Sequence, residues 1–169
     1  MSFLSRLFSK QPDAREAVRP LWHRVVEIAR EREWYAQCGV ADTVPGRFDA
    51  ITLVLSLVLL RMEREEALIA PSVRLTELFV DDMDGQLRQN GVGDIVVGKH
   101  IGKLMSVLGG RLGAYRDGLA AGGTAMAGAV ARNVTLAEGG DAAPAAARAT
   151  ALAERLAGIS GDDLLAARI

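Results

Sequence analysis

The longest apolar stretch constrains the fold of this chain more than any other feature. It covers residues 48–60, FDAITLVLSLVLL, and carries a charge only at Asp49 before Arg61 follows it. A membrane-spanning helix needs about 20 consecutive apolar residues, and this stretch is shorter. Its apolar residues cover nearly the whole helical circumference. The sequence therefore predicts a helix over about residues 46–67 at the centre of a protein core.

Helical periodicity also precedes this stretch. From Asp13, a suitable N-cap, one apolar stripe follows at helical spacing, formed by Val18, Leu21, Trp22, Val25, Ile28 and Ala29. Pro20 lies within the stripe, so the regular helix is expected to begin there or to bend there. Gly39 and Pro45 then predict a break before the central helix.

Two long helices are expected after the central one. Pro71 is predicted to stop the chain and Ser72 to cap a third helix over about residues 72–90. A fourth is expected to start near Gly93 or Asp94 and to carry an apolar face to Leu119. It contains six glycines between residues 98 and 118. So many small residues indicate a close approach between helices, or a bend at residues 109–110.

The last third of the chain has a weaker helical pattern. A helix is predicted over about residues 124–137, and the alanine-rich tail from Asp141 onwards is expected to be helical but loosely packed. No segment shows the period-two alternation of a half-buried strand. The predicted fold is therefore an all-α, single-domain bundle of about five to seven helices.

Composition excludes several classes of function. The 20 basic and 21 acidic residues give a net charge of −1, which argues against nucleic-acid binding. One cysteine and two histidines leave no intramolecular disulfide and make a structural zinc site implausible, and they fit a reduced cytoplasmic setting. Cys38 is expected to be a packed thiol, and His23 a partly buried polar residue. No nucleophile, general base or cofactor motif emerges, so no enzyme activity, cofactor or metal is predicted.

The segment GDIVVGKH at residues 93–100 resembles a phosphate-binding loop but departs from it. A helical pattern precedes it where a strand is needed, and His100 stands where Ser or Thr would hold magnesium. We therefore predict that the segment turns the chain between two helices and starts the second. Lys99 is expected to be a surface or ion-pairing residue.

The first residues form a unit of their own, an N-terminal amphipathic segment over residues 1–12. Phe3, Leu4, Leu7 and Phe8 recur at helical spacing. Two interpretations stay open: weak contact of residues 1–10 with a membrane surface, or a frayed terminus or strip packed on the body. Residues 13–169 are predicted to form the helical domain.

Two motif blocks carry a resemblance to a known family. The first is GVADTVPGRFD at residues 39–49, and the second is MDxxLRxxGVGDxxVGK at residues 83–99, followed by GR at 110–111 and AY at 114–115. In this order they resemble the ubiquinol–cytochrome c chaperone family over a family-like core at residues 21–119. Ala41 stands where the family usually has proline. The alanine-rich helical tail, residues 124–169, matches no motif of the family.

The resemblance implies an all-helical, non-enzymatic assembly chaperone. Such proteins bind newly made cytochrome b and promote assembly of the ubiquinol–cytochrome c reductase complex. A bacterial member would be cytoplasmic and peripheral to the inner membrane. The small partner protein and the ribosome contact of mitochondrial members do not transfer to this chain from sequence alone. The alternative is a helical scaffold or adaptor for another membrane protein complex.

A chaperone for a hydrophobic membrane protein should present a groove or an exposed apolar stripe with a charged rim. The candidate client-binding residues are Arg47, Asp49, Met83, Asp84, Arg88, Asp94, Lys99, Arg111 and Tyr115. A purely structural role stays open for the charged residues. Arg47 and Asp49 could pair inside the bundle, and Asp94 could cap its helix without binding a client.

Overall fold

The computed structural model describes residues 13–89 and 94–169, without the side chains of residues 86–89 and 94–100. Within these ranges the chain is helical, and its one bridge of β type joins Val40 to Leu136. The predicted all-α bundle is confirmed. The elements in chain order are η1 (Glu16–Val18), α2 (Arg19–Ala29), α3 (Arg32–Ala36), α4 (Val44–Met62), η2 (Glu66–Leu68), α5 (Ile69–Gln89), α6 (Asp94–Ala121), α7 (Gly123–Asn133), α8 (Ala143–Ala157) and α9 (Gly161–Leu165).

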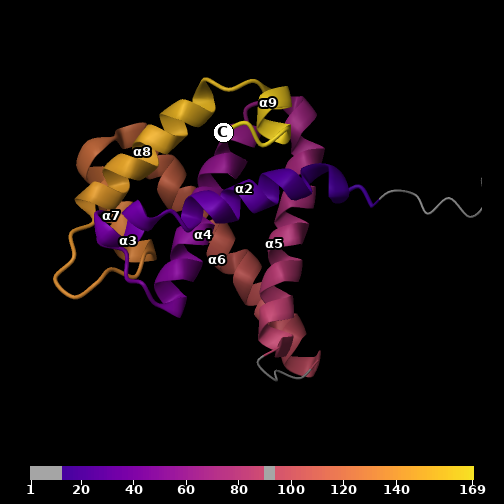
Figure 1. Cartoon of the computed structure of the whole chain (residues 1–169), viewed down its shortest axis with the longest axis horizontal. Coiled ribbons are helices and arrows are strands. Elements are labelled where there is room, and N and C mark those ends of the chain that lie inside the picture. Colours follow the sequence, from indigo (N-terminus) through magenta and orange to yellow (C-terminus); the bar gives the residue numbers. More distant parts are fainter. Residues whose placement is uncertain (1–12, 90–93) are drawn as a thin grey trace, which may run out of the picture.

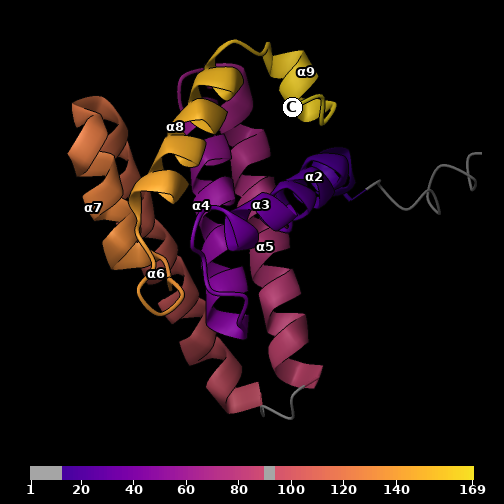
Figure 2. The same ribbon diagram turned by 60° about the vertical axis from the view of Figure 1, so that its left-hand side comes forward.

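Helix α4 lies at the centre of the bundle, with other helices around it (Figure 2). Every residue from 49 to 60 is buried, as the apolar stretch predicted. Thr43 caps the helix, because its hydroxyl accepts a hydrogen bond from the Gly46 N–H at 3.2 Å. Pro45 therefore lies in the first turn and does not break the chain. The helix ends at Met62, earlier than expected, where exposed Glu63 and Arg64 interrupt the apolar pattern.

Helix α2 lies across α4 and α5 (Figure 1). It begins at Arg19 with Pro20 in its first turn, so the proline starts the helix and does not bend it. Its buried face contains the predicted stripe. Trp22 packs edge-on against Phe79 of α5, with ring centroids 6.0 Å apart, and its indole N–H donates to Asp82 at 2.6 Å. These contacts fix α2 on the α5 side of the core.

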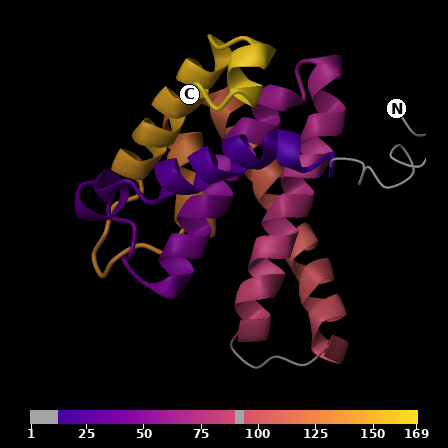
Figure 3. The same ribbon diagram turned by 45° about the vertical axis from the view of Figure 1, so that its right-hand side comes forward.

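Helices α5 and α6 lie side by side, and their joined ends project beyond the rest of the molecule (Figure 3). Helix α5 begins at Ile69, not at the predicted cap Ser72, whose hydroxyl donates to the Ile69 carbonyl at 2.7 Å. Pro71 falls in the first turn, where no helical N–H is needed, and so does not stop the chain. Helix α6 begins at Asp94 as predicted and continues as one helix through residues 109–110.

The alanine-rich tail packs tightly, so the prediction of loose packing is wrong. Helix α8 lies against α4 and α7 (Figure 2) and buries Ala145, Ala149, Leu152 and Leu156. The small alanines let α8 approach closely, and Arg61 of α4 donates to the Leu156 and Ile159 carbonyls at 3.1 and 2.8 Å. Helix α7 ends at Asn133 and not near residue 137, because the chain becomes extended there.

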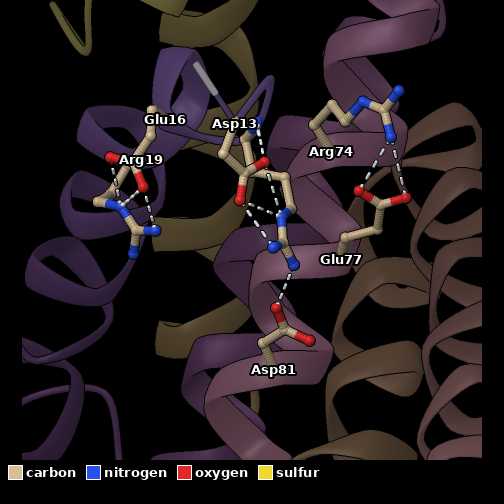
Figure 4. Close-up of polar contacts among 7 residues, drawn as sticks. Asp13, Glu16, Arg19, Arg74, Glu77 and Asp81 are labelled. Atoms are coloured by element: carbon tan, nitrogen blue, oxygen red, sulfur yellow. Dashed lines mark hydrogen bonds and ion pairs between the residues drawn. The ribbon is translucent and has the colours of Figure 1, made fainter. Parts of the chain in front are cut away.

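Exposed ion pairs join the start of the described chain to α5. Arg15 pairs with Asp13 at 2.7 Å and with Asp81 at 2.5 Å, and Figure 4 shows both carboxylates beside α5. The same view shows the pair of Arg74 and Glu77 within α5. In the part of the chain that the structure describes, no helix is long and apolar enough to span a membrane.

Candidate functional site

A groove of about 1150 Å³ lies along the N-terminal half of α4. We call it the α4 groove. Four helices and their flanking residues line it: Arg30, Arg32, Tyr35 and Ala36 from the α2–α3 region; Asp42, Val44, Pro45, Arg47, Phe48 and Ile51 from α4 and its approach; Met83 from α5; and Lys103, Leu104 and Val107 from α6.

The lining of the α4 groove is largely apolar. Phe48, Ile51, Leu104 and Val107 line it together with Met83 of α5. Phe48 packs against Phe79 of the core, with ring centroids 6.3 Å apart, so this side chain is held in place from behind. Val44, at the first residue of α4, is 84 % exposed. Apolar surface gathered in a concave site of this kind marks a binding surface for another molecule.

The polar lining of the groove is mostly basic. Among the described lining residues Asp42 is the one carboxylate, and it accepts a hydrogen bond from Nε of Arg47 at 2.6 Å. This hydrogen bond lowers the pKa of Asp42 and raises that of Arg47. Tyr35 donates its hydroxyl to the Ala29 carbonyl at 2.7 Å, and burial raises its pKa. The groove therefore combines an apolar surface with an excess of positive charge.

A buried polar cluster supports the groove from beneath. Arg111 of α6 donates to Oδ1 of Asp49 at 2.6 Å, and the two side chains are only 12 % and 8 % exposed. The backbone N–H and the hydroxyl of Thr135 donate to Oδ2 of Asp49 at 2.8 and 2.7 Å. Asp49 thus joins α4 to α6 and to the segment between α7 and α8.

Arg111 makes two further contacts in this cluster. Its guanidinium donates to the buried hydroxyl of Thr52. It also lies 5.5 Å from the ring centroid of Phe48, a cation–π distance. Since Phe48 lines the groove, the cluster positions part of the groove surface directly.

The structure places six of the nine predicted site residues, in three different environments. Arg47 and Met83 line the α4 groove. Asp49, Arg111 and Tyr115 lie inside the protein beneath it, and Arg47 and Asp49 have different partners rather than each other. Asp84 is half-buried and has an interaction partner. The side chains of Arg88, Asp94 and Lys99 lie outside the described residues.

Tyr115 is a core residue. It is fully buried, and its hydroxyl makes no hydrogen bond with the described residues. Burial raises the pKa of this phenol well above its ordinary value, so Tyr115 stays neutral. Its ring fills the core, and it is not available to a binding partner at the surface.

Several groove residues could not be found by sequence reasoning. Arg30, Arg32 and Tyr35 follow the first helical stripe in a charged segment that resembles an ordinary connection, and Lys103 and Leu104 belong to a periodic helix. Of the groove residues that were not predicted, Val44 carries a sequence signal that could have found it, because it is a large apolar residue between Thr43 and Pro45. These residues become a site only because α3, α4, α5 and α6 converge.

The glycines of α6 have different environments. At Gly118 a Cβ would lie 3.1 Å from the Met126 Cα and 3.3 Å from the Ala129 side chain, so the predicted close approach occurs there, against α7. At Gly102, Gly109, Gly110 and Gly113 a Cβ would meet nothing within 4 Å. The close approach expected from all these glycines is therefore limited, among those described, to one turn.

The other side chains considered for a chemical role are Cys38, His23 and possible metal ligands. Cys38 is buried, as predicted, and burial raises the pKa of its thiol. His23 is exposed, not partly buried, because its position on α2 faces away from the apolar stripe. Among the described residues no group of three histidine, cysteine, aspartate or glutamate side chains could hold a metal ion.

Comparison with known proteins decides the family. A family model described as "Ubiquinol-cytochrome C chaperone" matches residues 36–169. The chain belongs to the ubiquinol–cytochrome c chaperone family. The match starts later than the expected core at residues 21–119, and it includes the alanine-rich tail, in which no family motif was recognised. This agrees with the close packing of α8 on α4.

A solved structure supports the same assignment. The crystal structure of the Cbp3 homolog from Brucella abortus is 33 % identical in sequence to this chain and superposes with a TM-score of 0.80. The similarity covers 98 % of this chain and 94 % of that one, so the two proteins share the same fold. No protein with a curated description matches the chain by sequence.

Proposed function

We propose that this chaperone is not an enzyme and that it binds newly made cytochrome b in the α4 groove, thereby promoting assembly of the ubiquinol–cytochrome c reductase complex. The observation that carries the proposal is an open apolar groove, with Val44 84 % exposed at the start of α4, in a member of this family. Exposed apolar side chains gathered in a concave site mark a binding surface, which a single exposed valine on a convex surface would not do.

The size of the groove suits a short helical segment. A helix about 10 Å across with a rise of about 1.5 Å per residue fills about 1200 Å³ over roughly ten residues. The groove volume of about 1150 Å³ is close to this value. Cytochrome b is a hydrophobic helical membrane protein, and a helix with its apolar face in a groove is a common mode of recognition. Covering such a segment would keep it from aggregating before assembly.

The chemistry of the groove favours binding over catalysis. Among the described residues that line it there is no histidine, cysteine or serine, and the carboxylate of Asp42 is held by Arg47. The described lining therefore holds no Ser–His or Cys–His pair. We further propose that the chain meets cytochrome b at the cytoplasmic side of the inner membrane, as a peripheral protein. Residues 1–10 would add a weak contact with the membrane surface.

Replacing Val44 by aspartate tests this function. We expect the variant, purified from its own cells after cross-linking, to recover less than about a tenth of the cytochrome b recovered by the wild type, because a charge would oppose apolar contacts. The variant should stay folded, because the side chain is exposed and an acidic residue is favourable in the first turn of a helix.

The matched control is Val73→Asp. Val73 is 52 % exposed on α5 and does not line the α4 groove, so this variant should recover cytochrome b as the wild type does. Equal recovery by all three proteins would refute the assignment of the groove. Recovery of a different membrane protein in place of cytochrome b would indicate an adaptor for another complex.

A further inference from the structure

We infer that the α4 groove selects client segments in which carboxylates flank the apolar residues. This inference rests on the proposed function and adds to it the charge of the segment that is bound. The inference is carried by a set of cations at the groove that have no ion-pair partner among the described residues.

Most described arginines have a carboxylate partner. Arg61 pairs with Glu65 and Arg116 with Glu63, for example. Exposed Arg64, Arg132 and Arg155 have none among the described residues. Arg30, Arg32 and Lys103 also have none, but these cations lie together at one groove. All three are exposed, all three line the groove, and within the described residues none makes an ion pair or a side-chain hydrogen bond.

These cations come from different parts of the fold. Arg30 follows the last residue of α2, Arg32 begins α3, and Lys103 belongs to α6. They line the same groove as the apolar residues Phe48, Ile51 and Leu104. A segment with apolar side chains on one face and carboxylates at its ends would therefore meet matching groups in the groove. Guanidinium groups suit carboxylates particularly well, because they donate two parallel hydrogen bonds.

Arg47 adds a fourth positive charge that a client could reach. Its pair with Asp42 is largely in water, with the two side chains 63 % and 59 % exposed. An exposed pair of this kind contributes little stability, so a client carboxylate can share or replace Asp42 at small cost. Among the described residues that line it, the groove offers no unpaired carboxylate to a basic segment. It should therefore discriminate against clients with lysine or arginine at these positions.

A peptide carboxylate fits the groove better than an anionic lipid headgroup does. The cations surround a concave apolar volume of about 1150 Å³, into which side chains can insert. A membrane surface is broad and would contact the outer edge of such a groove more readily than its interior. Binding of an anionic lipid at these cations would therefore contradict the inference.

Peptide binding to the full chain measures the preference. The probes are three labelled ten-residue helical peptides that share a leucine face and carry glutamate, glutamine or lysine at both ends. Fluorescence anisotropy should show that the glutamate peptide binds about five- to tenfold more tightly than the glutamine peptide and that the lysine peptide binds most weakly. The difference should shrink as salt rises.

A double variant locates the effect. Arg30→Gln with Lys103→Gln removes two of the four groove cations and should clearly reduce the preference for the glutamate peptide over the glutamine peptide, while the same change at Arg64 and Arg155, exposed arginines outside the groove, should leave the preference intact. Circular dichroism before titration confirms that each variant is folded. The inference is overturned if the glutamate and glutamine peptides bind equally, or if neither binds.

Vesicles containing phosphatidylglycerol supply the remaining test. Vesicle binding that needs Arg30 and Lys103 and displaces the glutamate peptide would assign the cations to a lipid and overturn the inference. The proposed function fails separately: it depends on whether Val44→Asp loses cytochrome b. A chaperone that loses cytochrome b through Val44→Asp but shows no charge preference would keep its function and lose only this inference.

Discussion

Replacing Asp49 by alanine is expected to lower the free energy of unfolding by about 3 to 5 kcal/mol. The substitution removes the partner of Arg111, which is only 12 % exposed, and leaves this guanidinium charge buried. It also removes the acceptor for the N–H and hydroxyl of Thr135. Urea denaturation followed by circular dichroism measures the loss. A loss below about 1 kcal/mol would contradict the structural role given to this cluster.

Two further variants test whether the loss of stability comes from the buried charge of Arg111. Asp42→Ala breaks an ion pair of the same kind at the surface, where both partners are more than half exposed, and should cost at most about 1 kcal/mol. Adding Arg111→Met to Asp49→Ala should recover part of the loss, because the buried charge leaves together with its missing partner. If the double variant were less stable than Asp49→Ala, packing by Arg111 would outweigh its charge.

Replacing Gly46 by alanine is expected to cost about 3 kcal/mol or more, although alanine is otherwise the better helix former. A Cβ at Gly46 would lie 1.9 Å from the carbonyl oxygen of Ala41 and 2.9 Å from its carbonyl carbon. Both are backbone atoms, so the clash cannot be relieved by a side-chain rotation. The approach to α4, which carries Asp42 and leads into Val44, would have to move.

Gly109→Ala is the matched control for that substitution. Gly109 lies inside α6, and a Cβ there would meet nothing within 4 Å. Removing a flexible glycine from a helix should therefore raise the free energy of unfolding by up to about 1 kcal/mol. Thermal unfolding of both variants compares the two positions. A Gly46→Ala protein as stable as Gly109→Ala would show that residues 41–46 are not packed as described.

Gly46 and Asp49 explain part of the family resemblance physically. The motif GRFD at residues 46–49 contains the glycine that allows close approach, a phenylalanine of the groove and the buried aspartate. The motif GR at residues 110–111 supplies the arginine that pairs with that aspartate. Motifs far apart in sequence thus meet beneath the groove. Arg47 and Phe48 of the first motif form part of the groove surface, and Asp49 with Arg111 forms its support.

The fold was predictable from the sequence where one element determines its own burial. Residues 48–60 could only be a central helix, and the stripe ending at Ala29 could only be an amphipathic one. The tail was misjudged because alanine carries little hydrophobic signal. Its value for packing depends on the neighbouring helix, and α8 shows this with buried Ala145 and Ala149 against α4.

The candidate site was less predictable, because it depends on how helices converge. Arg111 and Asp49 were expected to meet a client, but they meet each other, since their positions on α6 and α4 face inward. Arg30 and Lys103 carry no motif, and the folded chain brings both to one groove. The type and spacing of charged residues along the sequence could not distinguish a buried ion pair, such as Asp49 with Arg111, from exposed cations at the rim of the groove, such as Arg30 and Lys103.

Photo-cross-linking from Val44 tests the central claim most directly. A photoreactive amino acid placed at Val44, in cells that make the ubiquinol–cytochrome c reductase complex, is illuminated during assembly, and the cross-linked proteins are identified. The same amino acid at Val73, exposed but outside the groove, serves as the control. The α4 groove as client site predicts an adduct with cytochrome b from Val44 and none from Val73. Adducts with cytochrome b of equal yield from both positions, or from Val73 alone, would contradict it.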